Sequence, residues 1–470
     1  MKVKWLVTAL VFLTITGAIG IAYLVFSPEL VSVSPQPGEV DVLAASPVRL
    51  TFSTTMQTES VEERLSFTPA VRGEFSWEER TLSFTPDQPW YSGESVTIHL
   101  QPGARSEGLI PLPLRGRHEW TFTISHTLLL YLSPTNGIVN LFAHDVQSGV
   151  TQQLTSSSTG LLDFSASPDG RYIYYSERNP TGGSDLIRMD RLGDDAGQPV
   201  IERLLACLHA FCHSAQVSPD GTYLAYEREP RPQIGQSLYS QVWLLALHPG
   251  NEIESGEIMN NPISQANHPT RSPAWSSTGW LSYYDLELKA FVLLNPVSGE
   301  LLEFSNETGE SGTWSPDGEA FVAPEIIYAP PPAGVEEFSL LAASHLLSFD
   351  LSTGEVHNLS QGVAIEDTFP VFSPDGNWLA FTRKFLDEAR WTPGRQIWIV
   401  DVSTGAIQSL TDSPSFNHSN IIWNPDGEKI AYLRINLDHL TDPVELWIVE
   451  ISTNEHHQIV SGAYSPLWIP

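Results

Sequence analysis

The sequence contains little sulfur and little positive charge. Only 2 cysteines and 4 methionines occur in 470 residues, and 24 Lys+Arg stand against 55 Asp+Glu, which gives a formal net charge of −31. Such an excess of carboxylates repels phosphate backbones, so no nucleic-acid partner is expected. The sequence also lacks a G-x-S-x-G elbow and an H-E-x-x-H motif. Enzymatic activity therefore has no motif to support it, and no cofactor is predicted.

The residues that are plentiful favour strands and turns. The chain has 14 Trp, 14 Tyr and 20 Phe, together with 33 Gly and 35 Pro. Aromatic and β-branched residues favour strands, whereas Gly and Pro mark turns. A chain of 470 residues exceeds one ordinary hydrophobic core, so we expect an all-β protein of at least two domains.

The N-terminal segment is the one long apolar run. Lys2 and Lys4 precede an uncharged stretch from Trp5 to Phe26. At about 1.5 Å per residue, a helix of this length spans the roughly 30 Å core of a bilayer. Residues 1–27 are therefore predicted to form an uncleaved transmembrane anchor, with the rest of the chain outside, at the cell surface or in the periplasm. A cleaved signal peptide is the alternative.

Residues 30–125 contain short alternating runs, which predict a small antiparallel sandwich. The segments "VRLTFSTTMQTESVEERLSFTP", "TLSFTPDQPWYSGESVTIHL" and "WTFTI" also follow one another in a familiar order. In this order the segment resembles the bacterial Ig-like domain family of surface-layer and envelope proteins. The resemblance implies a spacer, and adhesion through an exposed sheet is the alternative.

A repeated motif organises the remainder of the chain. Ser-Pro-Asp-Gly or a close variant recurs in "FSASPDGRYIYYSE", "QVSPDGTYLAYER", "AWSSTGWLSYYD", "TWSPDGEAFVAP", "FPVFSPDGNWLAFT" and "IWNPDGEKIAYLR". A second motif follows at a distance, as in "DVQSG", "NPVSG", "DLSTG" and "DVSTG". Both are turn sequences, and their fixed order at roughly 40–60 residues predicts propeller blades of four strands.

Residues 128–470 are therefore expected to form a β-propeller. The second motif predicts seven blades, and the first predicts six, which stays the alternative. The C-terminal "AYSPLWIP" reads as a first strand that pairs with residues 128–155, so that the two ends close the ring and remove a free sheet edge. The motifs resemble the TolB-like propeller repeat family, a WD40-like repeat that also occurs in prolyl-oligopeptidase propellers. By this resemblance the partner would be an envelope protein or a peptide.

Long loops of unequal length are predicted on one face of the propeller, where binding usually resides. Arg228, Arg383 and Arg434 share one register, seven residues after the motif glycine. They predict capture of carboxylates on a peptide or acidic glycan, with pairing to neighbouring Asp and Glu as the alternative. Arg390 and Trp391 form a candidate contact pair at a loop tip.

Four further residues precede predicted inner strands, near the mouth of the central channel: His213, His268, Asp367 and His418. A ring of histidines there could sense pH or bind a metal. The separations between these residues carry no metal-ligand pattern, so no metal is predicted, and solvated loop histidines are the other reading.

Cys207 and Cys212, in "ACLHAFCHS", are predicted to form a disulfide. A metal cluster with His209 and His213 is the alternative.

Taken together, these features predict a non-catalytic, membrane-anchored propeller that binds a protein or peptide. The alternatives are a glycan or small-molecule binder, for which only Trp391 and Tyr239 offer aromatic surface, and a hydrolase with its site in the channel. The oligomeric state has no sequence signal.

Overall fold

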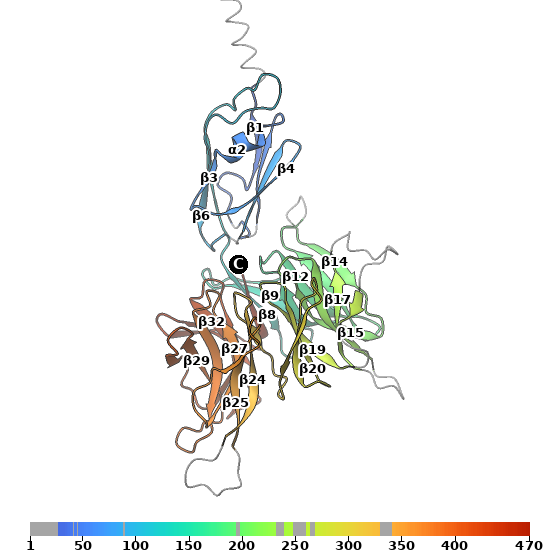
Figure 1. The fold of residues 1–470 in the computed structure, drawn as a ribbon, viewed down its shortest axis with the longest axis vertical. Coiled ribbons are helices and arrows are strands. Elements are labelled where there is room, and N and C mark those ends of the chain that lie inside the picture. Colours follow the sequence, from blue (N-terminus) through green and yellow to red (C-terminus); the bar gives the residue numbers. More distant parts are fainter. Residues whose placement is uncertain are drawn as a thin grey trace, which may run out of the picture. The chain divides into compact units, whose positions relative to one another are not determined.

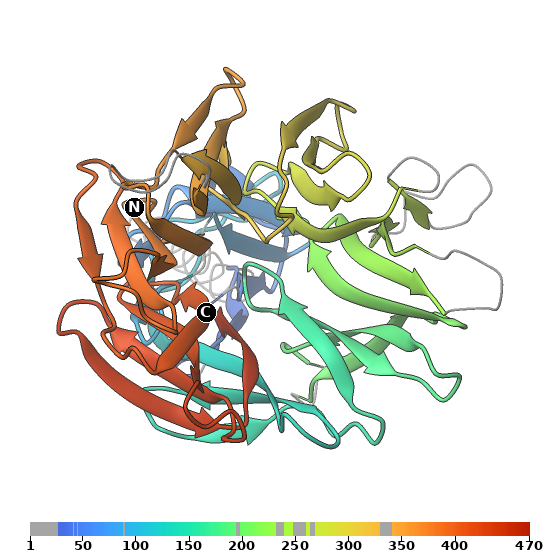
Figure 2. The same cartoon turned by 90° about the horizontal axis from the view of Figure 1, so that it is seen from below.

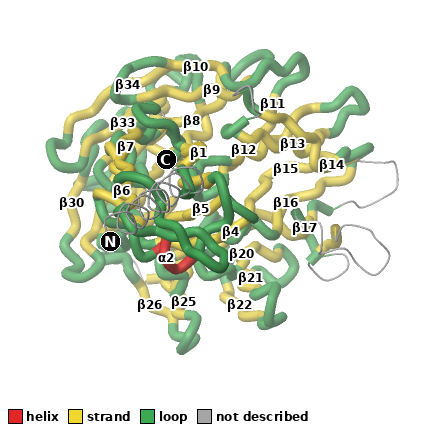
Figure 3. Tube along the Cα trace, turned by 90° about the horizontal axis from the view of Figure 1, so that it is seen from above, coloured by secondary structure: helices red, strands yellow, loops and turns green. Residues whose placement is uncertain are grey.

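The computed structural model describes residues 27–470 except 41, 45, 88–89, 194–197, 232–238, 248–259, 264–267 and 330–340. The chain divides into two compact units, the first ending at His126 and the second spanning Thr127–Ile469. Strands make up both units, and α2 (Thr58–Glu62) is the one helix among the described residues (Figures 1 and 3).

The first unit is a sandwich of two antiparallel sheets. One sheet has the order β1-β2-β5-β4 and the other β3-β6-β7. Alternation along β2 buries Val48, Leu50 and Phe52 between the sheets, where they join one apolar core. The strands are β1 (Leu30–Ser34), β2 (Val48–Phe52), β3 (Leu65–Thr68), β4 (Gly73–Glu78), β5 (Thr81–Pro86), β6 (Ser95–Leu100) and β7 (His118–Thr123).

In the second unit, the described strands fall into seven sets of four, and the sets follow one another around the unit in chain order (Figure 2). The first set is β10-β9-β8-β35, and the others are consecutive in the chain. Their bounds are β8 (Leu128–Ser133), β9 (Asn140–Asp145), β10 (Thr151–Gln153), β11 (Leu161–Ala166), β12 (Tyr172–Arg178), β13 (Ser184–Asp190), β14 (Val200–Leu205), β15 (Ala210–Val217), β16 (Tyr223–Pro230), β17 (Gln241–Ala246), β18 (Asn260–Pro262), β19 (Thr270–Trp275), β20 (Leu281–Asp285), β21 (Ala290–Leu294), β22 (Leu301–Ser305), β23 (Thr313–Trp314), β24 (Ala320–Ala329), β25 (Leu341–Asp350), β26 (Val356–Asn358), β27 (Ile365–Phe372), β28 (Trp378–Phe385), β29 (Gln396–Asp401), β30 (Ile407–Ser409), β31 (Phe416–Trp423), β32 (Lys429–Asn436), β33 (Glu445–Glu450), β34 (Glu455–Ser461) and β35 (Tyr464–Ile469).

The two repeated motifs are hairpin turns held by their own side chains. In the first motif, Ser373 Oγ donates to Asp375 Oδ1 and accepts the Trp378 amide proton at 2.9 Å. In the second motif, Asp401 Oδ1 accepts from the amides of Ser403 (2.9 Å) and Thr404 (2.8 Å). Each turn is thus complete without a ligand, which explains why its sequence repeats.

Indole side chains connect neighbouring sets. The residue before the first motif is Trp in several sets, and its Nε1 donates to a backbone carbonyl of the preceding set, two residues before that set's own motif. The bonds are Trp275 to Gln216 (2.9 Å), Trp314 to Ala274 (3.2 Å) and Trp423 to Val371 (3.1 Å). These equivalent contacts place the first-motif turns of neighbouring sets at the same end of the unit.

The predicted fold class is wrong about the closure of the sheets into a ring. The sheets are not closed into a propeller, because strand pairing stays within each sheet. Among the described residues the one bridge between two sets is Ser184 to Phe211. Neighbouring sets otherwise meet through side chains and through single backbone hydrogen bonds, such as those from the His418 amide to the Arg395 carbonyl (3.1 Å) and from the Thr270 amide to the Ser240 carbonyl (2.9 Å). The predicted pairing of the chain ends is present, since β35 pairs antiparallel with β8.

The predicted transmembrane helix and the location that depended on it are also corrected. Within the described part of the chain, no helix combines the length and the apolar character needed to cross a bilayer. The run from Trp5 to Phe26 lies outside the described residues. The N-terminal anchor, and with it the membrane-anchored extracytoplasmic location, is therefore withdrawn.

Candidate functional site

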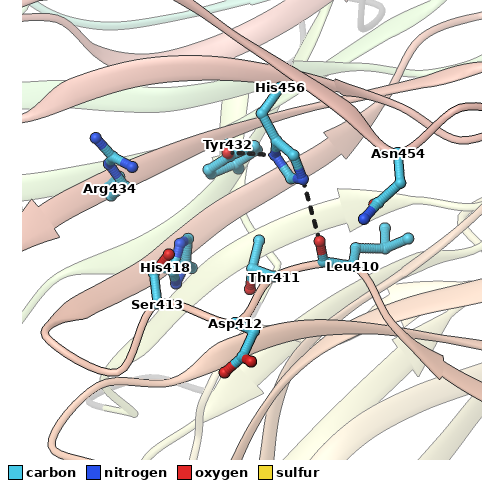
Figure 4. Close-up of a pocket in the computed structure, with 9 residues that line it drawn as sticks. All are labelled: Leu410, Thr411, Asp412, Ser413, His418, Tyr432, Arg434, Asn454 and His456. Atoms are coloured by element: carbon cyan, nitrogen blue, oxygen red, sulfur yellow. Dashed lines mark hydrogen bonds between the residues drawn. The ribbon is translucent and has the colours of Figure 1, made fainter.

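A pocket of about 310 Å³ lies between the last two sets of strands, β27–β30 and β31–β34 (Figure 4). Its wall is the connection from β30 to β31, which faces side chains of β32 and the beginning of β34. The lining residues are Leu410, Thr411, Asp412, Ser413, His418, Tyr432, Arg434, Asn454 and His456.

The wall segment is held by hydrogen bonds to the neighbouring strand β29. Gln396 accepts the Ser413 amide proton at Oε1 (2.9 Å) and donates from Nε2 to the Ser413 carbonyl (3.0 Å). Thr411 Oγ1 accepts from the Ile397 amide at 2.8 Å. The wall is thus fixed before any ligand arrives, which lowers the entropy cost of binding.

Arg434 supplies an immobilised positive charge to the pocket. Its Nε donates to Glu445 Oε2 at 2.8 Å, and its guanidinium carbon lies 4.1 Å from the centre of the Phe416 ring and 4.0 Å from that of Trp447. Among the described residues, the one hydrogen bond of this side chain is made by Nε, and the terminal nitrogens have no partner. A planar guanidinium with both terminal nitrogens available is suited to a carboxylate.

His418 contributes a neutral imidazole. The residue is 1 % exposed, and Nδ1 donates to the Arg395 carbonyl at 2.8 Å. Burial lowers the pKa of His418 to about 4. At neutral pH the ring is therefore uncharged, and its Nε2 carries a lone pair that can accept a hydrogen bond.

Tyr432 and His456 form a chain that has a counterpart elsewhere in the unit. His456 Nε2 donates to the Leu410 carbonyl at 3.1 Å, so its Nδ1 accepts from the Tyr432 hydroxyl at 2.9 Å (Figure 4). In the third set the equivalent Tyr226 donates to Asn260 Oδ1 at 2.8 Å. Because the same link recurs in another set, we assign it to architecture. Arg434, His418 and Asp412 are what distinguish the site.

The three arginines predicted from one register keep that register but not one environment. Arg383 is buried and makes a bidentate pair with Asp367, with both N–O distances at 2.7 Å. Arg228 lies with its guanidinium carbon 4.8 Å from the ring centre of Trp243. Of the three, only Arg434 lines the described pocket.

The remaining predicted contacts are separate from the pocket lining. Arg390 pairs with Asp387 (2.6 Å) beside Phe385, and Trp391 is 55 % exposed. His213 Nδ1 lies 3.0 Å from Ser214 Oγ, and His268 Nδ1 lies 2.8 Å from Asp285 Oδ2. The four predicted channel residues are each held by their own neighbours. Within the described ranges no three His, Cys, Asp or Glu gather as a metal site would require.

Cys207 and Cys212 form a disulfide, and both are buried. A thiol titration under denaturing conditions is expected to find no free thiol, and two free thiols would contradict the bond. Replacing both residues with alanine is expected to lower the free energy of unfolding by about 2 kcal/mol, because the bond closes a short loop. Urea unfolding of the variant, beside the reduced and the oxidised wild type, measures that loss.

Comparisons with known proteins agree with a two-part chain. Residues 26–124 match the bacterial Ig-like domain family, which confirms the predicted resemblance for the first unit. A segment of 158 residues is 28 % identical to dipeptidyl-peptidase 5 of Porphyromonas gingivalis, covering 33 % of this chain and 21 % of that protein. The chain thus spans about a fifth of this curated relative.

Solved structures give fold likeness at low identity. A puromycin-hydrolysing peptidase of Mycobacterium tuberculosis is similar with a TM-score of 0.50 and 12 % identity, over 79 % of this chain and 52 % of that one. TolB from Acinetobacter baumannii is similar with a TM-score of 0.42 and 12 % identity, over 87 % and 83 %. The chain is therefore similar to a bacterial Ig-like domain in its first unit and shares its fold with part of a peptidase.

Proposed function

We propose that the protein is a non-catalytic module that binds protein or peptide segments, and that the pocket takes up an ionised carboxylate of the bound segment. The observation that carries this proposal is Arg434. Its guanidinium is held between Phe416 and Trp447 and presents two terminal nitrogens that have no hydrogen-bond partner in the part of the chain that the structure describes. Because aromatic packing and Glu445 already fix the side chain, a carboxylate gains a bidentate contact at little entropic cost.

The other groups of the pocket suit the backbone of a peptide. His418 Nε2 can accept a peptide N–H, and Ser413 and Asn454 offer donors and acceptors beside it. A volume of about 310 Å³ accommodates one side chain or a short chain end.

The hydrogen bonds of the pocket residues favour binding over catalysis. In the described structure no hydrogen bond joins the Ser413 hydroxyl to His418, and the His418 Nδ1 proton is directed to a backbone carbonyl rather than to a carboxylate. A serine nucleophile normally requires a base within hydrogen-bond reach, itself oriented by a third group. The peptidase activity in the names of the relatives describes those proteins and is not part of this proposal.

The proposal is tested with fluorescein-labelled hexapeptides, blocked at both ends, that carry one Asp at a fixed position among Gly and Ser. The wild-type protein is expected to bind the Asp peptides about tenfold more tightly than peptides with Asn in place of Asp, as measured by fluorescence anisotropy. Arg434→Ala is expected to abolish that preference. Arg434→Lys is expected to restore part of it, because lysine keeps the charge but not the planar fork.

Lys289→Ala is the matched control, since Lys289 is an exposed cation that is also paired with a glutamate, Glu307, but lies in another set, in the β20–β21 turn. It should leave the preference unchanged. Equal binding of Asp and Asn peptides by the wild type would overturn the proposed function.

A further inference from the structure

We infer that the preferred partner segment carries a large apolar side chain next to its acidic one, and that it lies across the connection 410–416 onto both flanking loops. This inference deepens the proposed function and rests on it. It adds a second contact surface, made by Trp391 and Leu440, to the carboxylate pocket at Arg434.

Backbone hydrogen bonds bring the two loops to the pocket wall. Gly394, in the β28–β29 loop that carries Trp391, donates from its amide to the Pro414 carbonyl at 3.3 Å. Leu437, in the β32–β33 loop that carries Leu440, donates from its amide to the Ser415 carbonyl at 2.8 Å. Consecutive residues of one wall segment therefore hold one loop each, and the pocket wall lies between them.

Both loops expose a large apolar side chain. Trp391 is 55 % exposed and Leu440 is 73 % exposed. Other surface residues next to Trp391 are tied down: Arg390 is paired with Asp387 and lies over the Phe385 ring. Aromatic residues and arginines are more frequent in interaction surfaces than on the rest of a protein's surface. An exposed aromatic residue on an ordered loop, close to a fixed arginine, therefore fits an interaction surface.

Charge selects the kind of segment. The chain carries a net charge of −31, yet this region presents the partly free guanidinium of Arg434 and the ammonium of Lys384, which lies 5.2 Å from the Trp391 ring centre. Lys384 has no carboxylate partner within the part of the chain that the structure describes. The β32–β33 loop also carries Asp438 and Asp442, and Asp412 lines the pocket, so an acidic residue of the segment is complemented locally, at Arg434 and Lys384, with its apolar neighbour against Trp391 and Leu440.

The test uses two labelled, end-blocked hexapeptides, Gly-Ser-Asp-Phe-Ser-Gly and Gly-Ser-Asp-Ser-Ser-Gly, and the inverted order Gly-Ser-Phe-Asp-Ser-Gly. One of the Phe peptides is expected to bind wild type about tenfold more tightly than the peptide without Phe. The double variant Trp391→Ala, Leu440→Ala is expected to lose that advantage while it keeps the preference for Asp over Asn. Trp391→Tyr with Leu440 intact should retain most of the advantage, because an aromatic surface remains.

The control is Val297→Ala, Val402→Ala, which removes exposed apolar side chains from second-motif turns at the other end of the strands. It should change neither preference. If the Phe and Phe-free peptides bind wild type equally, or if the double variant keeps the Phe advantage, the inference is overturned and the carboxylate site stands. If Asp and Asn peptides bind equally, or no acidic peptide binds, the proposed function itself fails.

Discussion

Replacing Asp367 with alanine is expected to lower the free energy of unfolding by about 3–5 kcal/mol, because it leaves the buried guanidinium of Arg383 without a counter-charge. Asp367 is fully buried, and Arg383 is 3 % exposed. Asp367 also accepts a hydrogen bond from Ser360 Oγ at 2.7 Å. Urea unfolding followed by near-UV circular dichroism measures the loss.

Two comparisons separate this effect from ordinary truncation. Asp387→Ala removes the partner of Arg390 in a solvent-screened pair, where a much smaller loss is expected. The double variant Asp367→Leu, Arg383→Met removes both buried charges and should be much more stable than Asp367→Ala. A loss in Asp367→Ala no greater than in Asp387→Ala would contradict a buried ion pair at this place.

The second large effect is a loss of stability in acid that depends on His418. Its pKa falls from the ordinary 6.5 to about 4, mainly through burial, which corresponds to roughly 3 kcal/mol. Since the unfolded chain binds the proton more tightly, this stability is fully present above about pH 6.5. It is lost progressively as the pH falls from there toward about 4. Urea unfolding at steps between pH 7 and 4 measures the slope.

His418→Gln should remove that part of the slope, since glutamine cannot titrate. Burial also lowers the pKa of His144, His345 and His456, so these three residues still contribute an acid dependence of the same sign in the variant. An unchanged slope in His418→Gln would show that the folded protein accommodates the proton at His418.

Much of the architecture was predictable because the repeats are local. A turn such as Ser-Pro-Asp-Gly is bonded within itself, so its residues predict its shape without knowledge of the neighbours. The pairing of β35 with β8 followed from counting strands. Closure of the sheets was predicted wrongly, since strand patterns specify pairing within a sheet and say nothing of how the faces of separate sheets meet.

The pocket was only partly predictable, because its residues are brought together from strands distant in the sequence. Arg434 was identified from its register and His418 from its place before a predicted inner strand, but Asp412, Ser413 and Tyr432 were not identified. A signal was present in the departures from the repeat. Asn454 replaces the glycine of the second motif with a positive φ of 55°, and His456 stands where three other sets have Leu301, Val356 and Ile407.

Arg228, Arg383 and Arg434 share one register in the repeat but differ in their surroundings. Identical backbone positions gave three different environments, because the residue opposite each arginine differs: Cys212, Asp367 and His418. Where that residue is a carboxylate, the guanidinium of the arginine is used in a buried ion pair. Where it is a buried neutral imidazole, the arginine pairs with Glu445 through Nε, and its terminal nitrogens have no hydrogen-bond partner among the residues described.

The indole bonds between neighbouring sets bear on how such a chain can grow. Each Trp donates to the set before it, and the accepting carbonyl belongs to the backbone at a fixed place relative to the motif. A duplicated four-strand unit therefore brings its own donor and, whatever its side chains, its own acceptor. At these three junctions a unit gained or lost by gene duplication would therefore need no compensating change in the adjoining unit to keep the indole bond.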